Sequence, residues 1–197
     1  ITATTTQTAL SVAGLTNGVA YTFTVLATNL VGTGPVSAAS NSTTPAALPD
    51  APTGITVTSG DGQVYLSWDI SDGNGAAIIY YSIISSLGTT ATTTDNSFTV
   101  TGLENGTVYS FTLTATSNVG TSPSSVTTGS VTPATIPSVP LNVTATSTES
   151  QGAQVSWGVP LSDGGSPILN YTVTSMPGSI TATTTQTALS VAGLTNG

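Results

Sequence analysis

The chain repeats its own sequence, and this repetition constrains the fold more than any other feature. Residues 1–18 read ITATTTQTALSVAGLTNG, and residues 180–197 are identical to them letter for letter. Inside this period of 179 residues lies a weaker one of 88 to 91 residues, which preserves single positions. Its clearest pairs are Leu15 with Leu103, Tyr21 with Tyr109, Trp68 with Trp157, and Tyr81 with Tyr171. Such self-similarity predicts an array of similar modules, two to each long period.

Within the repeats, apolar and polar residues alternate over short runs. Residues 21–28 and 109–116 place an apolar side chain at every second position, and residues 55–58 and 64–68 alternate in the same way. A period of two with one apolar face is typical of a half-buried strand. Turn-forming clusters of Gly, Asp, Asn and Ser lie between the runs, at residues 59–62, 71–75 and 104–106. Short strands at this spacing, without a helical stripe, predict an all-β sandwich or barrel.

Several of these stretches together resemble the fibronectin type III family in its bacterial form. The motif P-x-x-P-x-x-I-x-V at residues 49–57 resembles the opening strand, and VYLSW at residues 64–68 resembles the second strand with its core Trp. The motif L-x-x-G-x-x-Y-x-F at residues 103–111 resembles the corner before the sixth strand, where the Tyr hydroxyl bonds back to the backbone. The resemblance implies tandem fibronectin type III-like, and thus immunoglobulin-like, β-sandwiches in a head-to-tail array.

The resemblance also divides the chain. Residues 1–46 match the C-terminal half of a module, residues 47–135 a complete module, and residues 136–197 the N-terminal half of a further one, in which residues 180–197 repeat 1–18. The implied core consists of large apolar side chains from all three parts. These are Trp68, Tyr81, Leu103, Tyr109 and Phe111 in the complete module, Trp157 and Tyr171 after it, and Leu15, Tyr21 and Phe23 before it.

Each predicted half-module would expose the apolar face that a sandwich buries. Burying one large apolar side chain stabilises a protein by about 1.5–3 kcal/mol, so an uncovered half forfeits much of a domain's stability. We therefore expect copies of the chain to complete one another head-to-tail. The neighbour is either covalently continuous or joined by strand exchange between subunits. The duplicated eighteen residues favour the covalent alternative, in which the chain is a window of a longer tandem polypeptide.

The composition excludes several classes of function. The chain has no Lys, Arg, His or Cys, and eight acidic residues give it a net charge of -8. Without cationic side chains it cannot neutralise phosphates, so we expect no nucleic-acid partner. The mostly apolar stretch 76–84 is far shorter than a bilayer requires, so we expect no membrane span. No base is present to activate the many Ser and Thr hydroxyls, so we expect no enzyme and no catalytic residue.

The remaining site candidates are carboxylates and glycosylation triplets. Asp69 and Asp72 could supply oxygens to calcium, but the second module keeps only Asp163, in place of Asp72. We favour a turn there, and we expect no metal and no other cofactor. Asparagine followed by x-Ser/Thr, the acceptor triplet for glycosylation, occurs at Asn41, Asn105, Asn142 and Asn170.

The sequence therefore predicts a structural protein. We expect a repeat segment of a long extracellular fibre, stalk or sheath at a microbial cell surface, where the absence of trypsin sites favours durability. The alternative is an adhesin stalk, or a carbohydrate-binding or spacer module of a secreted or surface protein, whose binding head lies outside these residues.

Overall fold

The computed structural model describes residues 1–148 and 151–195, and it confirms the all-β prediction. These residues contain strands and no helix, so none of them forms a helix able to cross a membrane. The strands are β1 (Thr56–Gly60), β2 (Gln63–Ser67), β3 (Ile78–Ser85), β4 (Thr90–Thr93), β5 (Ser97–Thr101), β6 (Phe111–Ser117), β7 (Leu141–Ser147), β8 (Gly152–Gly158), β9 (Tyr171–Thr174), β10 (Thr181–Thr184) and β11 (Ala188–Ala192). Residues 149, 150, 196 and 197 of the predicted third module lie outside the described residues.

The chain divides into two compact units. The first consists of Ile1–Thr56, Leu66–Phe98 and Ser110–Thr128, and the second consists of Val57–Tyr65, Thr99–Tyr109 and Gly129–Gly197. The division falls inside the segment 47–135, whereas the module bounds given above follow the sequence repeats. Those module bounds therefore remain predictions.

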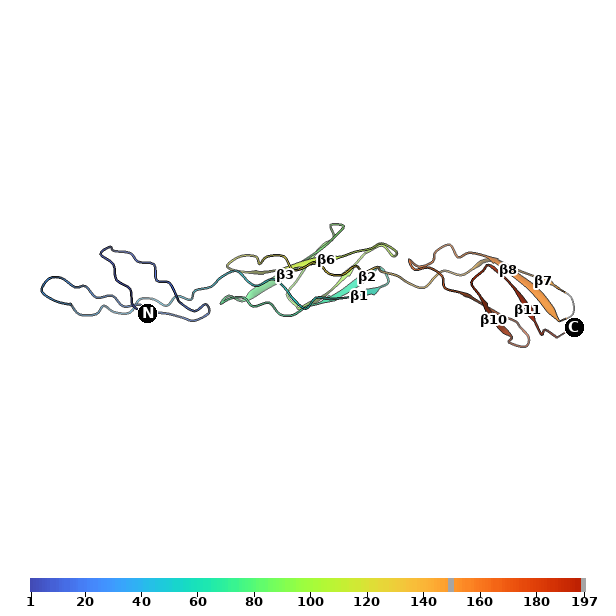
Figure 1. Ribbon diagram of the computed structural model, residues 1–197, viewed down its shortest axis with the longest axis horizontal. Coiled ribbons are helices and arrows are strands. Elements are labelled where there is room, and N and C mark those ends of the chain that lie inside the picture. The colour runs from blue at the N-terminus through green and yellow to red at the C-terminus, as the bar shows by residue number, and fades with distance from the viewer. Residues whose placement is uncertain (149–150, 196–197) are drawn as a thin grey trace. The chain divides into compact units, whose positions relative to one another are not determined.

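The first unit contains an antiparallel sheet of strand order β4-β3-β6, with β3 in the centre. Figure 1 labels two of its strands, β3 and β6. In its register, Tyr81 lies opposite Ala115 and Ile83 lies opposite Leu113. These four side chains are buried, while the residues between them along β6 are only half-buried. The predicted alternation over residues 109–116 is thus the pattern of a strand with one face in the core.

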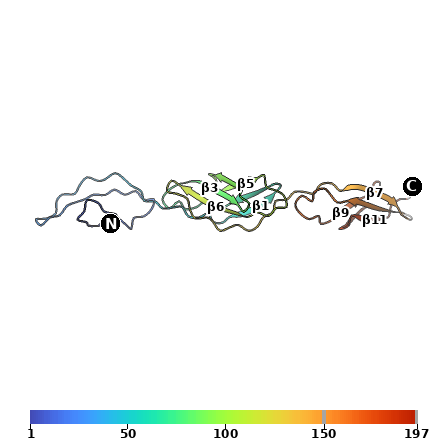
Figure 2. The ribbon, with the colours of Figure 1, turned by 90° about the horizontal axis from the view of Figure 1, so that it is seen from above.

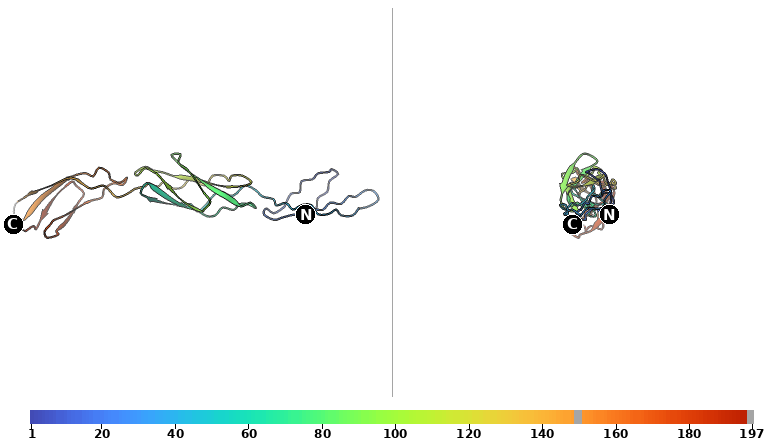
Figure 3. Two further views of the ribbon diagram at one scale, coloured as in Figure 1. Left: turned by 180° about the vertical axis from the view of Figure 1, so that it is seen from behind. Right: turned by 90° about the vertical axis from the view of Figure 1, so that its left-hand side faces the viewer.

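Residues 1–46, also in the first unit, form no strand. Figures 1 and 3 show this segment in blue as a ribbon without arrows. The strand predicted for residues 21–28 is wrong: isolated bridges join Tyr21 to Thr43 and Thr28 to Thr33. The physical reason is that this segment has pairing partners on one side only among the described residues, and its bridges to them do not form a regular ladder. A regular strand needs neighbours that pack against it, because β-strand preference depends more on side-chain packing than on the backbone.

The second unit contains a sheet of order β11-β8-β7 and a two-stranded sheet of β10 and β9, visible in Figure 2 through β7, β9 and β11. In register, Leu189 lies opposite Val155 and Val173 lies opposite Ala182. A third sheet, β1-β2-β5, lies mostly in this unit and has the same order as β7-β8-β11. The repeat in sequence is thus a repeat in strand order.

Each unit also holds a close backbone contact between glycines at equivalent repeat positions. A Cβ on Gly75 would lie 2.4 Å from the Gly18 nitrogen, and one on Gly165 would lie 2.3 Å from the Gly106 nitrogen. Both separations are too short for any side chain. These two contacts, which we call the glycine joints, are therefore built in the same way. Glycine is required at Gly75 and Gly165 because a Cβ does not fit there and because φ is positive.

Candidate assembly site

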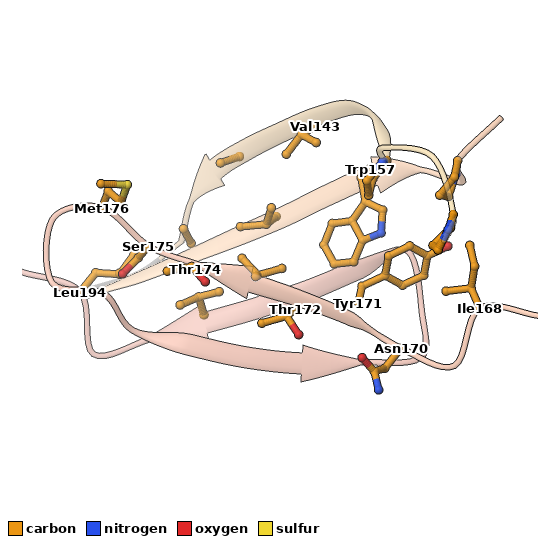
Figure 4. A pocket seen from close by; sticks show the side chains of 18 of the residues that line it. Val143, Trp157, Ile168, Asn170, Tyr171, Thr172, Thr174, Ser175, Met176 and Leu194 are labelled. Atoms are coloured by element: carbon orange, nitrogen blue, oxygen red, sulfur yellow. The ribbon is translucent and has the colours of Figure 1, made fainter. Parts of the chain in front are cut away.

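The second unit carries a cavity of about 760 Å³, which we call the open cavity. Its walls come from β7, β8, β9 and the end of β11, and Figure 4 shows the side chains that line it. The lining residues include Pro137, Pro140, Val143, Val155, Trp157, Ile168, Tyr171, Val173, Met176, Val191 and Leu194. None of the described residues that line it is charged. The cavity is therefore an apolar and hydroxyl-rich space at the place where a sandwich keeps its core.

An aromatic pair is among the side chains that line the open cavity. The rings of Trp157 and Tyr171 have centroids 5.3 Å apart (Figure 4). Trp68 and Tyr81 form the same pair at the same distance in the middle of the chain. Both indole Nε1 groups are buried without a hydrogen-bond partner in the structure. The Trp–Tyr pair thus recurs from one repeat to the next at the same ring distance.

The residues around the two pairs differ in how well they are covered. Tyr81 and Ile83 of β3 are buried, whereas their repeat equivalents Tyr171 and Val173 of β9 are only half-buried. The difference follows from pairing, because β3 lies between β4 and β6. Within the described residues β9 pairs with β10 alone, so its second edge is free. The open cavity lies beside a strand that lacks the neighbour its equivalent has.

The segment 19–46 is built like that missing neighbour. Its amide-to-carbonyl bonds, Gly18 to Pro45 and Tyr21 to Thr43, are each 2.9 Å. The equivalents 88 residues on, Gly106 to Pro133 and Tyr109 to Val131, are 2.9 and 2.8 Å. The tyrosine corner is also repeated: the Thr16 amide donates to the Tyr21 hydroxyl at 3.0 Å, as the Glu104 amide does to Tyr109.

Burial separates these two hairpins although their bonding is the same. Leu113 is 0% exposed, whereas its equivalent Val25 is 72% exposed. Phe111 is buried, whereas Phe23 is half-buried. The segment 19–46 thus presents a formed but uncovered apolar face.

One recurring feature was missed from the sequence. Residues 122, 125 and 128 each donate their amide to the carbonyl of residues 115, 113 and 111, and each side-chain hydroxyl accepts the amide of the same partner at 2.9 Å. Each advance of three residues along the segment 122–128 thus corresponds to an advance of two residues along β6. Ser37 and Ser40 repeat the pattern with Val25 and Phe23. The signal available in the sequence was a Ser or Thr at every third position, in a run that is preceded by a Gly or a Pro.

The two aspartates considered for calcium each accept a local hydrogen bond. Asp72 accepts the Asn74 amide at 2.8 Å, which is the turn favoured from sequence. Asp69 accepts a hydrogen bond from the Thr53 hydroxyl at 3.3 Å. Within residues 1–148 and 151–195, no group of three or more His, Cys, Asp or Glu side chains could hold a metal ion.

The four glycosylation triplets differ in accessibility. Asn41, Asn142 and Asn170 are exposed. Asn105 is half-buried, and both ends of its amide are bonded: Nδ2 donates to Asp61 and Oδ1 accepts the Gly62 amide, each at 2.8 Å. The exposed three are therefore the better acceptors, and their modification remains a prediction.

The residues predicted for the core fall into two groups. Those of the complete module and Trp157 are buried: Trp68, Tyr81, Leu103, Tyr109, Phe111 and Trp157. Those of the predicted half-modules are half-buried: Leu15, Tyr21, Phe23 and Tyr171. The first group is thus buried, and the second group is incompletely covered.

Antiparallel sheets, a buried Trp directly after the second strand β2 and a tyrosine corner are hallmarks of immunoglobulin-like β-sandwiches. Residues 50–130 match the family described as fibronectin type III domain. This segment, less than half of the chain, thus carries the fibronectin type III pattern that the sequence motifs predict.

A relative of known name and several solved structures are similar to the chain. Exoglucanase B of Cellulomonas fimi is 32% identical over 208 residues, covering 96% of this chain and 19% of that protein. The twitchin kinase region of C. elegans is 24% identical, covering 44% of this chain and 17% of its own, with a TM-score of 0.41. A titin fragment is 22% identical, covering 47% and 36%, also with a TM-score of 0.41. The chain thus spans less than a fifth of the length of its curated relative.

Proposed function

We propose that this chain is a structural, non-enzymatic segment of an extracellular fibre, stalk or sheath built from tandem fibronectin type III modules. The observation that supports this most directly is the repeated hairpin, bonded alike at residues 19–46 and 107–134 but covered only in the second case. A module that is formed but uncovered serves to join the next module. The two glycine joints support the same proposal, because the same close backbone approach recurs at equivalent positions of successive repeats.

The chemistry of the chain agrees with a passive role. The chain has eight acidic side chains and no basic side chain, so no side-chain ion pair can form and assembly is expected to tolerate salt. The absence of Lys and Arg also removes every trypsin site, which suits a protein exposed outside the cell.

The experiment images the native assembly by electron microscopy and measures the axial spacing. Two modules stacked end to end, from strands of about 10 residues at about 3.3 Å per residue, give a repeat on the order of 60–80 Å. A globular particle without an axial repeat would contradict the proposal.

A second function is favoured by the similarity to Exoglucanase B. In this alternative the chain is a spacer or carbohydrate-binding module beside an enzyme that acts on glucan. A glycan array with cellulose included separates the possibilities, because a passive spacer or fibre gives no signal. Saturable binding to one glycan would favour the carbohydrate-binding alternative.

A further inference from the structure

We propose that two Asn–Gly pairs of the glycine joints are latent deamidation sites, each held closed by an aspartate. The chain contains four Asn–Gly pairs, and in these two the asparagine side chain donates to a carboxylate. They are Asn74–Gly75, held by Asp50, and Asn105–Gly106, held by Asp61. The inference goes beyond the proposed function, because it concerns the chemical lifetime of the joints and not what the chain assembles into.

Deamidation of an Asn–Gly pair needs only water. The backbone nitrogen of the glycine gives up its proton and attacks Cγ of the asparagine. A C–N bond forms while the bond from Cγ to Nδ2 breaks and ammonia leaves. Water then opens the resulting succinimide at one of its two carbonyls, giving aspartate or isoaspartate. Glycine favours the attack because it has no Cβ to restrict the backbone.

The Asn74 side chain is held by two acceptors. Its Nδ2 donates to Asp50 Oδ1 and to the Leu48 carbonyl, each at 2.9 Å. The Asn74 backbone amide donates to Asp72 Oδ1 at 2.8 Å, which fixes the turn. An amide group has two hydrogens to donate, so both are engaged. These bonds have to break before Cγ can turn toward the Gly75 nitrogen in the orientation that the attack requires.

Asn105 is held in a similar way by different partners. Its Nδ2 donates to Asp61 Oδ1 and its Oδ1 accepts the Gly62 amide, each at 2.8 Å. The nitrogen that would attack, that of Gly106, itself donates to the Pro133 carbonyl at 2.9 Å. These hydrogen bonds therefore hold both reacting groups in place, away from the geometry of attack.

Deamidation of either pair would damage the joint to which it belongs. A carboxylate at position 74 would face the Asp50 carboxylate, and a carboxylate at position 105 would face Asp61. Like charges at such short range repel each other. Isoaspartate would also lengthen the backbone next to a contact that leaves no room for a Cβ at Gly75 or Gly165. The two aspartates thus protect the joints from a slow chemical change.

The first test measures deamidation by peptide mapping with mass spectrometry, after incubation of the chain in mildly alkaline buffer. Elastase is the protease, because the chain has no Lys or Arg for trypsin. Both pairs should react about tenfold more slowly in the folded chain than in urea, the factor expected for a hydrogen bond to a charged acceptor. Asp50→Ala should remove most of this protection at Asn74 and leave Asn105 unchanged. Asp61→Ala should do the reverse.

Two further variants are the controls for the first test. Asp95→Ala removes an exposed carboxylate and should change neither rate. Asp50→Asn keeps an oxygen that can accept from Asn74, so deamidation should stay slower than in Asp50→Ala. Equal acceleration of both pairs by one aspartate variant would report a general loosening and overturn the inference. Equal rates in the folded chain and in urea would overturn it as well.

The second test asks whether the product opens the joint. Asn74→Asp reproduces the aspartate product, and hydrogen exchange measured by mass spectrometry follows Gly18, whose amide donates to the Pro45 carbonyl. We expect exchange in that segment to become about tenfold faster. Asn118→Asp is the matched control, because Asn118 is exposed and the variant adds the same charge outside the joint. Equal exchange in the two variants would show that the joint tolerates the product, and the inference would fail.

Discussion

Two stretches of this chain have the same eighteen residues and different structures. In the second, residues 181–184 form β10 and residues 188–192 form β11, which pairs with β8. In the first, residues 1–18 form no strand. Val191 is accordingly 4% exposed, whereas the identical Val12 is only half-buried.

The local turn inside the two stretches is nevertheless the same. The Gln7 amide donates to the Thr5 hydroxyl at 3.0 Å, and the Gln186 amide donates to Thr184 at 3.1 Å. Local hydrogen bonds therefore depend on the sequence itself, whereas strands depend on the partner beside them. Covered and uncovered copies of one sequence should differ in energy by the contacts that the partner supplies.

The largest expected effect tests that difference with phenylalanine. Phe111→Ala empties a buried site and should lower the free energy of unfolding by about 3–5 kcal/mol. Phe23→Ala, at the equivalent uncovered site, should cost no more than about 1 kcal/mol, because little packing is lost. Urea unfolding of the dilute chain, followed by tryptophan fluorescence, measures both. Equal losses would show that the segment 19–46 is covered in the isolated chain.

The two glycine joints, Gly75 with Gly18 and Gly165 with Gly106, should respond alike to substitution, because the same close contact is made in both. Gly75→Ala should cost about 1–3 kcal/mol more than Gly88→Ala. Both positions have a positive φ, +93° and +88°, so the backbone penalty is shared. Only at Gly75 would the methyl meet backbone, since nothing lies within 4 Å of a Cβ on Gly88. The difference between their urea midpoints isolates the joint, and Gly165→Ala should reproduce it.

The strands that could be predicted from the sequence are those that have a partner in a sheet. The alternation at residues 109–116 and the VYLSW motif at 64–68 correspond to β6 and β2, because each has a partner in the sheet. The same alternation at 21–28 predicts a strand that is absent, because alternation reports a face and not its neighbour. Asp72 was interpreted as a turn residue, which local chemistry decides. The open cavity was not predictable in volume or lining, since it depends on how β7, β8 and β9 are arranged.

A smaller effect compares the duplicated valines directly. Val191→Ala should lower local stability by about 1.5 kcal/mol, the value of two buried methylene equivalents. Val12→Ala removes the same atoms from a half-buried site and should cost about half as much or less. Hydrogen exchange measured by mass spectrometry reads the two segments separately. Equal protection changes would mean that the pairing of β11 with β8 adds no burial.

The smallest expected effect on stability concerns the Ser hydroxyls that accept backbone amides in the repeated pattern described above. The Ser125 hydroxyl accepts the buried Leu113 amide, and the Ser37 hydroxyl accepts the exposed Val25 amide, at 2.9 and 3.0 Å. Ser125→Ala should cost about 1 kcal/mol, because the amide loses an acceptor where water cannot replace it. Ser37→Ala should cost a few tenths of a kcal/mol at most, since water reaches that site. The hydrogen bond is the same at both positions, but only the one at Ser125 is buried. A larger loss of unfolding free energy for Ser125→Ala than for Ser37→Ala therefore reports the effect of burial. A loss at Ser37 as large as at Ser125 would instead assign it to the hydrogen bond alone, and the comparison of covered and uncovered copies would lose its physical basis.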